Sequence, residues 1–336
     1  MSLDLPLIWA LLIALAVFAY VVMDGFDLGI GILFPMVRGK AERDVMVNSI
    51  APVWDGNETW LVMGGGGLFA VFPLAYAILL PALYMPLTIM LLALVFRGVA
   101  FEMRFRARND REQRRWDRSF QWGSMVAALA QGLALGAYVQ GIKVEGRHYA
   151  GGWWDWLTPF SLLTAVALTT GYALLGSCWL IWKTEGVLQR RFRAAARGLA
   201  CALLGCIGAV SVAMLALSAS FRAHWLVPPG AFGAILVPVI VLVMAWLFFA
   251  ALAKGRAFEP FLCALGLFLL SYIGLGISMW PMMIAPDVSI RDAAAPPMSQ
   301  GFLLIGAAVL IPLILAYTGF VYWLFRGKVK LGAGYH

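Results

Sequence analysis

Four acidic side chains lie in stretches of sequence that are otherwise apolar enough to cross a membrane. Asp24 and Asp27 belong to VVMDGFDLGIG, near the end of the first apolar segment, and Asp55 and Glu58 belong to APVWDGNETWLVMGGGG, near the start of the second. A carboxylate at membrane depth costs roughly 2.5 to 3.5 kcal/mol even on lenient insertion scales, so such groups are paired, hydrated or protonated. Their grouping indicates a path for protons or a site that holds a cation.

The spacing of the acids supports a shared site. Asp24 and Asp27 are three residues apart, as are Asp55 and Glu58, so each pair occupies one face of a helix. Pro52, which precedes Asp55, could loosen the helix backbone and admit water. The alternative is purely structural, because the acids could simply pair with polar groups nearby. The candidate partners are Asn57, Arg97, backbone amides and a neighbouring subunit.

Arg97 and Glu102 extend the set of candidate residues. They lie in VFRGVAFEMR, at the end of the third apolar segment. Each could join the acidic cluster, or could extend along the helix to place its charge at the membrane surface. Both roles stay open from the sequence.

Composition identifies an integral membrane protein of the all-α, polytopic class. The chain has 336 residues, of which 62% are hydrophobic and 12% charged, whereas soluble domains contain about 25% charged residues. The net charge of +8 arises from Lys and Arg in short segments between apolar runs, a pattern of membrane topology that argues against nucleic-acid binding. The amino-terminal MSLDLPLIWA has no basic region, which favours a retained helix over a cleaved signal peptide.

The hydropathy pattern predicts nine membrane spans in a single domain covering residues 1–336. A span needs about 20 mostly apolar residues. The second segment fits least well because Pro52, polar side chains and four glycines interrupt it; a re-entrant element there would leave eight spans. The expected ranges are 6–34, 48–74, 77–100, 120–142, 160–182, 199–219, 231–252, 258–281 and 300–325.

The distribution of basic residues favours nine spans and orients them. With nine spans, 20 of the 25 Lys and Arg residues fall in one alternating set of loops and four in the other. Because basic loops stay on the cytoplasmic side, we expect a periplasmic N-terminus and a cytoplasmic C-terminus. Both acidic pairs then lie about 10–15 Å inside the cytoplasmic face.

The sequence offers few ligands for a cofactor. His148 and His224 fall in outer loops and His336 is the last residue, so no histidine lies in a span. A membrane haem generally needs an axial histidine. The four cysteines form no CxxC pair, which disfavours an iron–sulfur cluster. We therefore expect no haem ligand and no metal site in this chain.

Several sequence blocks form a characteristic series. They are DGFDLGIG at 24–31, NSIAPVWDGNETWL at 48–61, GGGGLFAVFP at 64–73, FRGVAFEMR at 96–104 and IPLILAYTGFVYW at 311–323. Together these blocks resemble the second subunit of the cytochrome bd-type quinol oxidases, including the cyanide-insensitive branch. The first hundred residues carry most of the resemblance.

The resemblance implies a haem-free subunit of a bacterial inner-membrane complex. Its fold would be two four-helix bundles plus a peripheral helix. The larger subunit I would carry haems b558, b595 and d (or b) and oxidise quinol at the outer face. That subunit would reduce O₂ to water with protons from the cytoplasm. One or more small single-helix subunits, bound lipid and a structural ubiquinone are further expectations, and no residue here is assigned to the quinone.

The same resemblance suggests roles for individual residues. Asp24 and Asp55 match acidic positions of a hydrophilic path, and Asp27 matches a further acid of the motif. Glu58 is a weaker candidate, because some relatives carry an amide there. Trp60 matches a tryptophan near the mouth of an apolar O₂ route; packing against lipid or a subunit is the alternative.

Three functions follow as hypotheses. The first is a non-haem oxidase subunit that supplies protons to its partner's oxygen site. The second is a stand-alone proton-coupled transporter, although such folds usually show broken helices at equivalent positions of two halves and only one such segment is evident here. The third is an assembly partner whose acids only form pairs. Copurification with a haem-bearing subunit would separate the second from the others.

Overall fold

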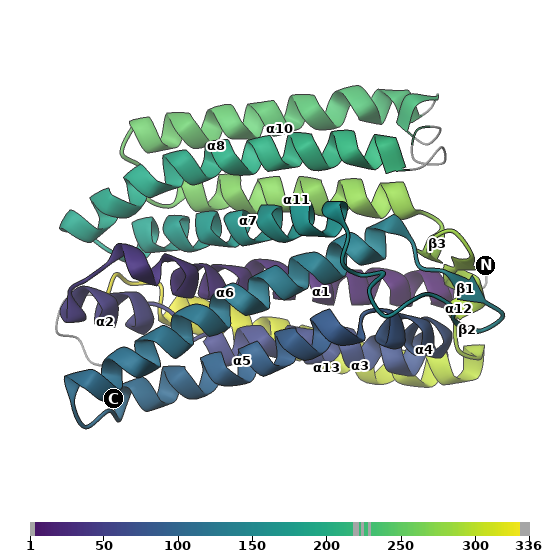
Figure 1. Cartoon of the computed structure of the whole chain (residues 1–336), viewed down its shortest axis with the longest axis horizontal. Helices are drawn as coiled ribbons and strands as arrows, with labels where there is room; N and C mark the ends of the chain where they lie inside the picture. Colours follow the sequence, from purple (N-terminus) through teal and green to yellow (C-terminus); the bar gives the residue numbers. More distant parts are fainter. Residues whose placement is uncertain (1–3, 218–221, 223–224, 228–229, 330–336) are drawn as a thin grey trace.

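The computed structural model describes residues 4–217, 222, 225–227 and 230–329, and it is built almost entirely of helices. The exceptions are two short antiparallel hairpins that lie at one end of the molecule (Figure 1). In the first, β1 (Val144–Glu145) pairs with β2 (His148–Tyr149); in the second, β3 (Met282–Ile284) pairs with β4 (Val288–Ser289). The prediction of an all-α polytopic protein is confirmed.

Within the described part of the chain, eight helices are long and apolar enough to cross a membrane. They run between the same two ends of the molecule (Figure 1). They are α1 (Leu5–Leu33), α5 (Tyr84–Phe105), α6 (Asp110–Gln140), α7 (Pro159–Lys183), α8 (Gly186–Leu217), α10 (Gly230–Ala253), α11 (Glu259–Met279) and α13 (Pro297–Leu324).

The expected second span, 48–74, is wrong as a single helix. The short helix α2 (Lys40–Asn48) ends there, residues 49–53 form turns, and α3 (Trp54–Val71) begins afterwards. Pro52 explains the interruption, because proline lacks an amide donor and disfavours a helical residue before it. Helix α3 is not among the eight apolar helices, because its start is polar, but it packs along α1.

The expected third span, 77–100, is also divided. Helix α4 (Pro73–Ala82) ends before Leu83, and α5 continues from Tyr84. The ring of Pro86 would clash with the carbonyl of Ala82 in a continuous helix, which accounts for the break. Helices α6 and α8 begin well before the predicted spans. Their first turns are helical, but they are too polar to lie in hydrocarbon, so hydropathy did not include them.

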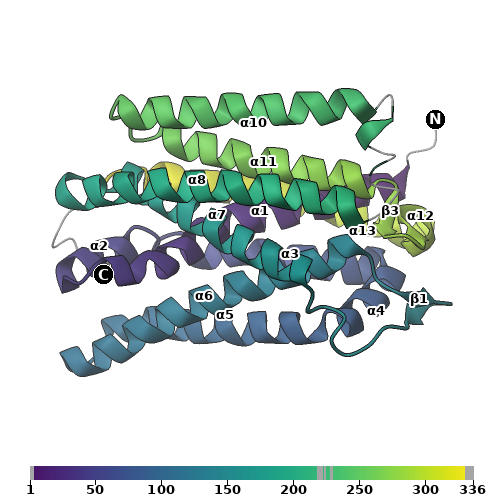
Figure 2. The ribbon, with the colours of Figure 1, turned by 45° about the horizontal axis from the view of Figure 1, so that its top comes forward.

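The helices form two adjoining groups. Figures 1 and 2 show α7, α8, α10 and α11 on one side and α1, α3, α5 and α6 on the other. Helix α1 packs against α3, α6 and α7, so it joins the groups. Helix α13 lies along the outside with only Gln300 buried. This is the expected arrangement of two four-helix bundles and a peripheral helix. The remaining short helices are η1 (Phe34–Met36) and α12 (Ile290–Ala293).

Two glycines bring α1 and α7 into close contact. A methyl group on Gly29 would overlap the backbone carbonyl oxygen of Tyr172, and one on Gly176 would come within 2.6 Å of the Gly29 carbonyl carbon. The two backbones therefore touch where α1 carries its acidic pair. This contact fixes the depth and rotation of Asp24 and Asp27.

We expect Gly29→Ala to destabilise the protein by about 1–3 kcal/mol, because the added methyl group must separate two packed backbones. A thermal melt of the purified complex would measure this. Gly65→Ala is the matched control, because a methyl group there meets no atom within 4 Å. Equal melting temperatures for the two variants would contradict the close contact.

Candidate functional site

One buried arginine lies among three of the four predicted acids. Arg97 of α5 is 1% exposed, and Asp24 and Asp27 of α1 are fully buried. The Arg97 Nη1 atom lies 3.1 Å from Asp24 Oδ1 and also contacts Glu58 Oε1 of α3, while Nη2 lies 3.9 Å from Asp27 Oδ2. We call these four residues the Arg97 cluster. Its carboxylates outnumber its cation, so it can hold a proton at modest electrostatic cost.

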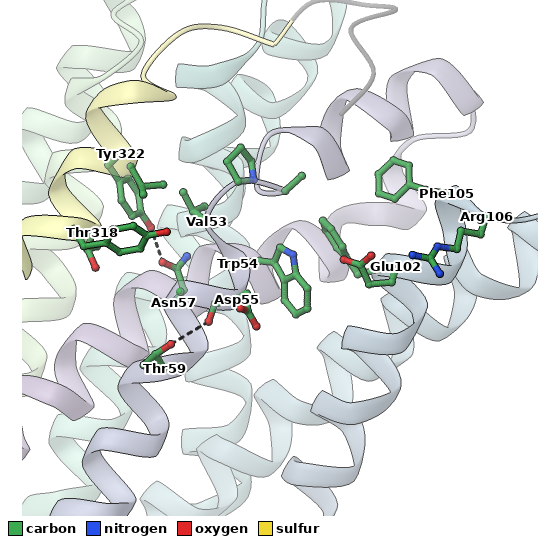
Figure 3. Close-up of a pocket in the computed structure, with 16 residues that line it drawn as sticks. Val53, Trp54, Asp55, Asn57, Thr59, Glu102, Phe105, Arg106, Thr318 and Tyr322 are labelled. Atoms are coloured by element: carbon green, nitrogen blue, oxygen red, sulfur yellow. Dashed lines mark hydrogen bonds between the residues drawn. The ribbon is translucent and has the colours of Figure 1, made fainter. Parts of the chain in front are cut away.

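Asn57 ties the Arg97 cluster to a third helix. Its Nδ2 donates to Asp27 Oδ2 at 2.7 Å and to the Met23 carbonyl at 3.3 Å. Its Oδ1 accepts a 2.8 Å hydrogen bond from the Tyr322 hydroxyl of α13 (Figure 3). From the sequence, Asn57 was expected only as a possible partner of the acids. Tyr322 was not predicted, because a tyrosine in an apolar helix usually packs against neighbouring side chains.

Asp55 and Glu102 lie in a cavity beside the Arg97 cluster (Figure 3). The cavity has a volume of about 710 Å³ and lies between the start of α3, the end of α5 and α13. Both side chains are exposed, and neither forms an ion pair with another described residue. Asn57 and Tyr322 also line this cavity, so they separate it from Asp27.

The structure therefore divides the predicted acidic site into two parts. Asp24, Asp27 and Glu58 gather on Arg97, whereas Asp55 and Glu102 face the cavity. We expected the four motif acids to converge in one layer; three of them meet at Arg97, whereas Asp55 lies beside them in the cavity and forms no ion pair with a described residue. The reason is the interruption at 49–53: Asp55 falls in the exposed first turn of α3 instead of deep in a continuous helix.

Several buried polar atoms of the cluster have no hydrogen-bond partner among the described residues. They are Oδ2 of Asp24, Oδ1 of Asp27 and Nε of Arg97, while Oδ1 of Asp24 and Nη2 of Arg97 form only the ion-pair contacts given above. The indole Nε1 of Trp60 is a further case. Buried polar atoms in folded proteins are almost always satisfied, by protein or by ordered water. A concentration of them at one place is typical of a hydrated interior site.

Trp60 lies inside the protein. It is 1% exposed and packs with Ala16 and Tyr20 of α1. The alternative that it faces lipid is therefore wrong, while its place on an O₂ route stays a prediction.

A row of neutral groups continues from the cluster toward α6 and α7. Tyr20 lies beside Asp24. The Gln131 side chain donates from Nε2 to the Tyr20 hydroxyl at 2.7 Å, and the Tyr172 hydroxyl donates to Gln131 Oε1, also at 2.7 Å. Sequence reasoning missed all three residues, because uncharged polar side chains in an apolar helix give no strong signal.

The described residues do not fit a buried haem. His148 lies exposed on β2, and His224 and His336 fall outside the described residues. Among the described residues, no group of three or more His, Cys, Asp or Glu side chains could hold a metal ion. In the Arg97 cluster the guanidinium already occupies the space between the carboxylates.

Comparison with known proteins identifies the family. The model of the family described as cytochrome bd terminal oxidase subunit II matches residues 5–325. This chain belongs to that family. The chain is thus a subunit of an oxidoreductase complex and a multi-pass membrane protein, and the stand-alone transporter is not favoured.

Individual relatives cover nearly the whole chain. Subunit 2 of the cytochrome bd-I ubiquinol oxidase of Escherichia coli (strain K12) is 29% identical, over 97% of this chain and 95% of the relative. Subunit 2 of the cytochrome bd ubiquinol oxidase of Bacillus subtilis (strain 168) is also 29% identical, over 96% of each. A chain of the bd oxidase structure from Geobacillus thermodenitrificans superposes with a TM-score of 0.76 at 16% identity, covering 97% of this chain and 100% of that one. This last likeness supports the fold.

Proposed function

We propose that this chain is the haem-free subunit of a quinol:O₂ oxidoreductase and that it conducts protons from the cytoplasm toward a haem-bearing subunit I. The observation that carries the proposal is the contact between an open cavity and a buried charged cluster. Asp55 and Glu102 lie in the cavity, and Asn57 lines it while bonding Asp27 of the cluster. Relatives of nearly equal length are ubiquinol oxidase subunits, which supports quinol and O₂ as substrates of the complex.

The basic residues give the proposed direction. The α5–α6 turn and helix α2, with their Arg and Lys residues, lie at the same end of the molecule as the start of α3 and the end of α5, which line the cavity. Basic loops remain on the cytoplasmic side of a membrane. The proposed placement is therefore the bacterial inner membrane, with the N-terminus periplasmic and the C-terminus cytoplasmic.

The proposed steps use only side chains of this chain. A proton from water in the cavity is held at Asp55, which shares the cavity with Glu102, and passes to Glu58, the member of the Arg97 cluster whose side chain is 27% exposed. Arg97 stays protonated and stabilises whichever carboxylate is ionised after the proton has moved. Water bound to the buried oxygens without protein partners would complete the relay. The haems of subunit I would supply the oxygen chemistry.

Further expectations concern the surroundings of the path. The outer face of α13 offers apolar surface for lipid or for a small single-helix subunit, because only Gln300 is buried along it. Trp60, in its apolar setting, is proposed to line a route for O₂. A structural ubiquinone has no assigned residues.

Asp55→Asn tests the proposal against a purely structural role for the acids. We expect O₂ reduction to slow by roughly tenfold or more, because the amide cannot take up and release the proton. Assembly should be unchanged, because Asp55 is exposed and forms no ion pair with the described residues. The measurement is quinol-driven O₂ consumption per haem in the purified complex.

Asp287→Asn is the matched control, because Asp287 is an exposed acid near the β3–β4 hairpin, at the other end of the molecule. It should turn over like the wild type. Wild-type turnover of a fully assembled Asp55→Asn complex would contradict the proton path.

A further inference from the structure

One face of α6 carries four arginines that have no partner within the described structure. Arg111, Arg114, Arg115 and Arg118 are exposed, and no hydrogen bond or ion pair joins their side chains to another described residue. Their spacing of i, i+3, i+4 and i+7 places them on a single helix face. We call these residues the α6 basic stripe.

The acids of this segment do not neutralise the α6 basic stripe. Two of the three carboxylates between residues 110 and 118 are paired with cations outside the stripe, and the third, Glu112, accepts a hydrogen bond from a backbone amide and forms no ion pair with a described residue. The partners are Lys40 for Asp110 at 3.4 Å, the Arg108 amide for Glu112 at 3.0 Å, and Arg43 and Arg104 for Asp117 at 2.9 and 2.7 Å. With one such carboxylate against four guanidinium groups, the stripe presents a net positive charge at the surface.

This arrangement destabilises the helix on its own. Helix α6 begins at Asp110, so Arg111 of the stripe lies in its first turn, where the helix dipole disfavours a cation. Like charges at i, i+4 also repel each other, as Arg111 and Arg115 do. The tendency of basic residues to stay on the cytoplasmic side explains why arginines occur in this segment. It does not require them to share one face of the helix. An external anion would relieve both costs.

The position of the stripe points to phospholipid headgroups. Trp122 follows Arg118 by one turn on the same face and is 60% exposed, and tryptophan is typical of the level where headgroups meet hydrocarbon. The buried side of α6, with Phe120 and Ser124, faces the opposite way. The guanidinium group binds phosphate through two parallel hydrogen bonds.

We propose that the α6 basic stripe, together with Trp122, binds the phosphates of anionic glycerophospholipids in the cytoplasmic leaflet. The inference is independent of the proton path, because it uses none of the residues of the Arg97 cluster or of the cavity.

Lipid retention by the purified oxidase complex tests the proposal. The complex is offered equal amounts of phosphatidylglycerol and phosphatidylcholine in neutral detergent, and bound lipid is counted by native mass spectrometry. We expect the wild type to retain phosphatidylglycerol selectively, and less of it at high salt. Replacement of all four stripe arginines by glutamine should reduce retention by roughly tenfold or more, whereas four lysines should preserve most of it.

The control removes positive charge from another exposed site, at the start of α8. Arg190 and Arg197 of α8 are likewise exposed and without ion pairs to described residues; Arg190→Gln with Arg197→Gln should leave retention unchanged. Equal retention by the wild type and the glutamine variant would overturn the proposal, as would cross-linking of the stripe to acidic residues of a subunit without lipid selectivity. If the glutamine variant fails to assemble, lack of selectivity in the wild type would overturn it equally.

Discussion

Arg97→Gln is expected to lower the stability of the complex more than any other single substitution in the path. Asp24 and Asp27 are fully buried, and Arg97 is the cation that the described residues place within 4 Å of both. Removing one partner of a buried ion pair costs about 3–5 kcal/mol, because the remaining charge is left without compensation. Thermal unfolding of the complex, followed by its haem absorbance, would report the loss.

Two comparisons make this result specific. Arg106→Gln should change little, because Arg106 is exposed at the rim of the cavity. Adding Asp24→Asn to Arg97→Gln should restore part of the stability, because it removes one of the uncompensated carboxylates. An Arg97→Gln complex with the thermal stability of the wild type would show that the cluster carries no net ionic interaction.

Asp24→Asn is expected to reduce O₂ consumption by about 10²-fold, the range for removing a group that transfers protons, while the complex still assembles. Asparagine has nearly the shape of aspartate, and Arg97 keeps Asp27 and Glu58 as partners. The substitution thus removes one group that can bind the proton, while the Arg97 guanidinium keeps two carboxylate partners. Turnover with saturating quinol, normalised to haem content, is the measurement.

Asp24→Glu provides the complementary test. A longer carboxylate at the same position should recover part of the lost rate, because the group can still be protonated and ionised. If Asp24→Asn instead prevented assembly while Asp24→Glu allowed it, the main role of Asp24 would be structural. Undiminished turnover in Asp24→Asn would remove Asp24 from the path.

The charged part of the site could be predicted from sequence because charge in an apolar segment is costly and therefore conspicuous. Asp24, Asp27 and Glu58 were placed together for this reason, and the structure brings them to one guanidinium. The position of Asp55 could not be predicted, because it depends on where α3 begins after the turns at 49–53.

The neutral members of the site were beyond sequence reasoning. Tyr322 reaches Asn57 from α13, and Gln131 joins Tyr20 to Tyr172 across three helices. Such contacts depend on the rotation and depth of helices far apart in the sequence, which hydropathy does not specify. The division of the third span at Leu83 likewise depended on one proline, Pro86, in a run that is apolar throughout.

The most direct test of the proton path is the rate of proton uptake during a single turnover. The fully reduced complex is mixed with O₂, and a pH-sensitive dye follows protons removed from the solution while haem absorbance follows electron transfer. If protons enter through Asp55, Asp55→Asn slows proton uptake by roughly tenfold, and the electron-transfer steps that need protons slow with it. Uptake at the wild-type rate in a fully assembled Asp55→Asn complex would contradict the claim that protons reach the oxygen site through this cavity.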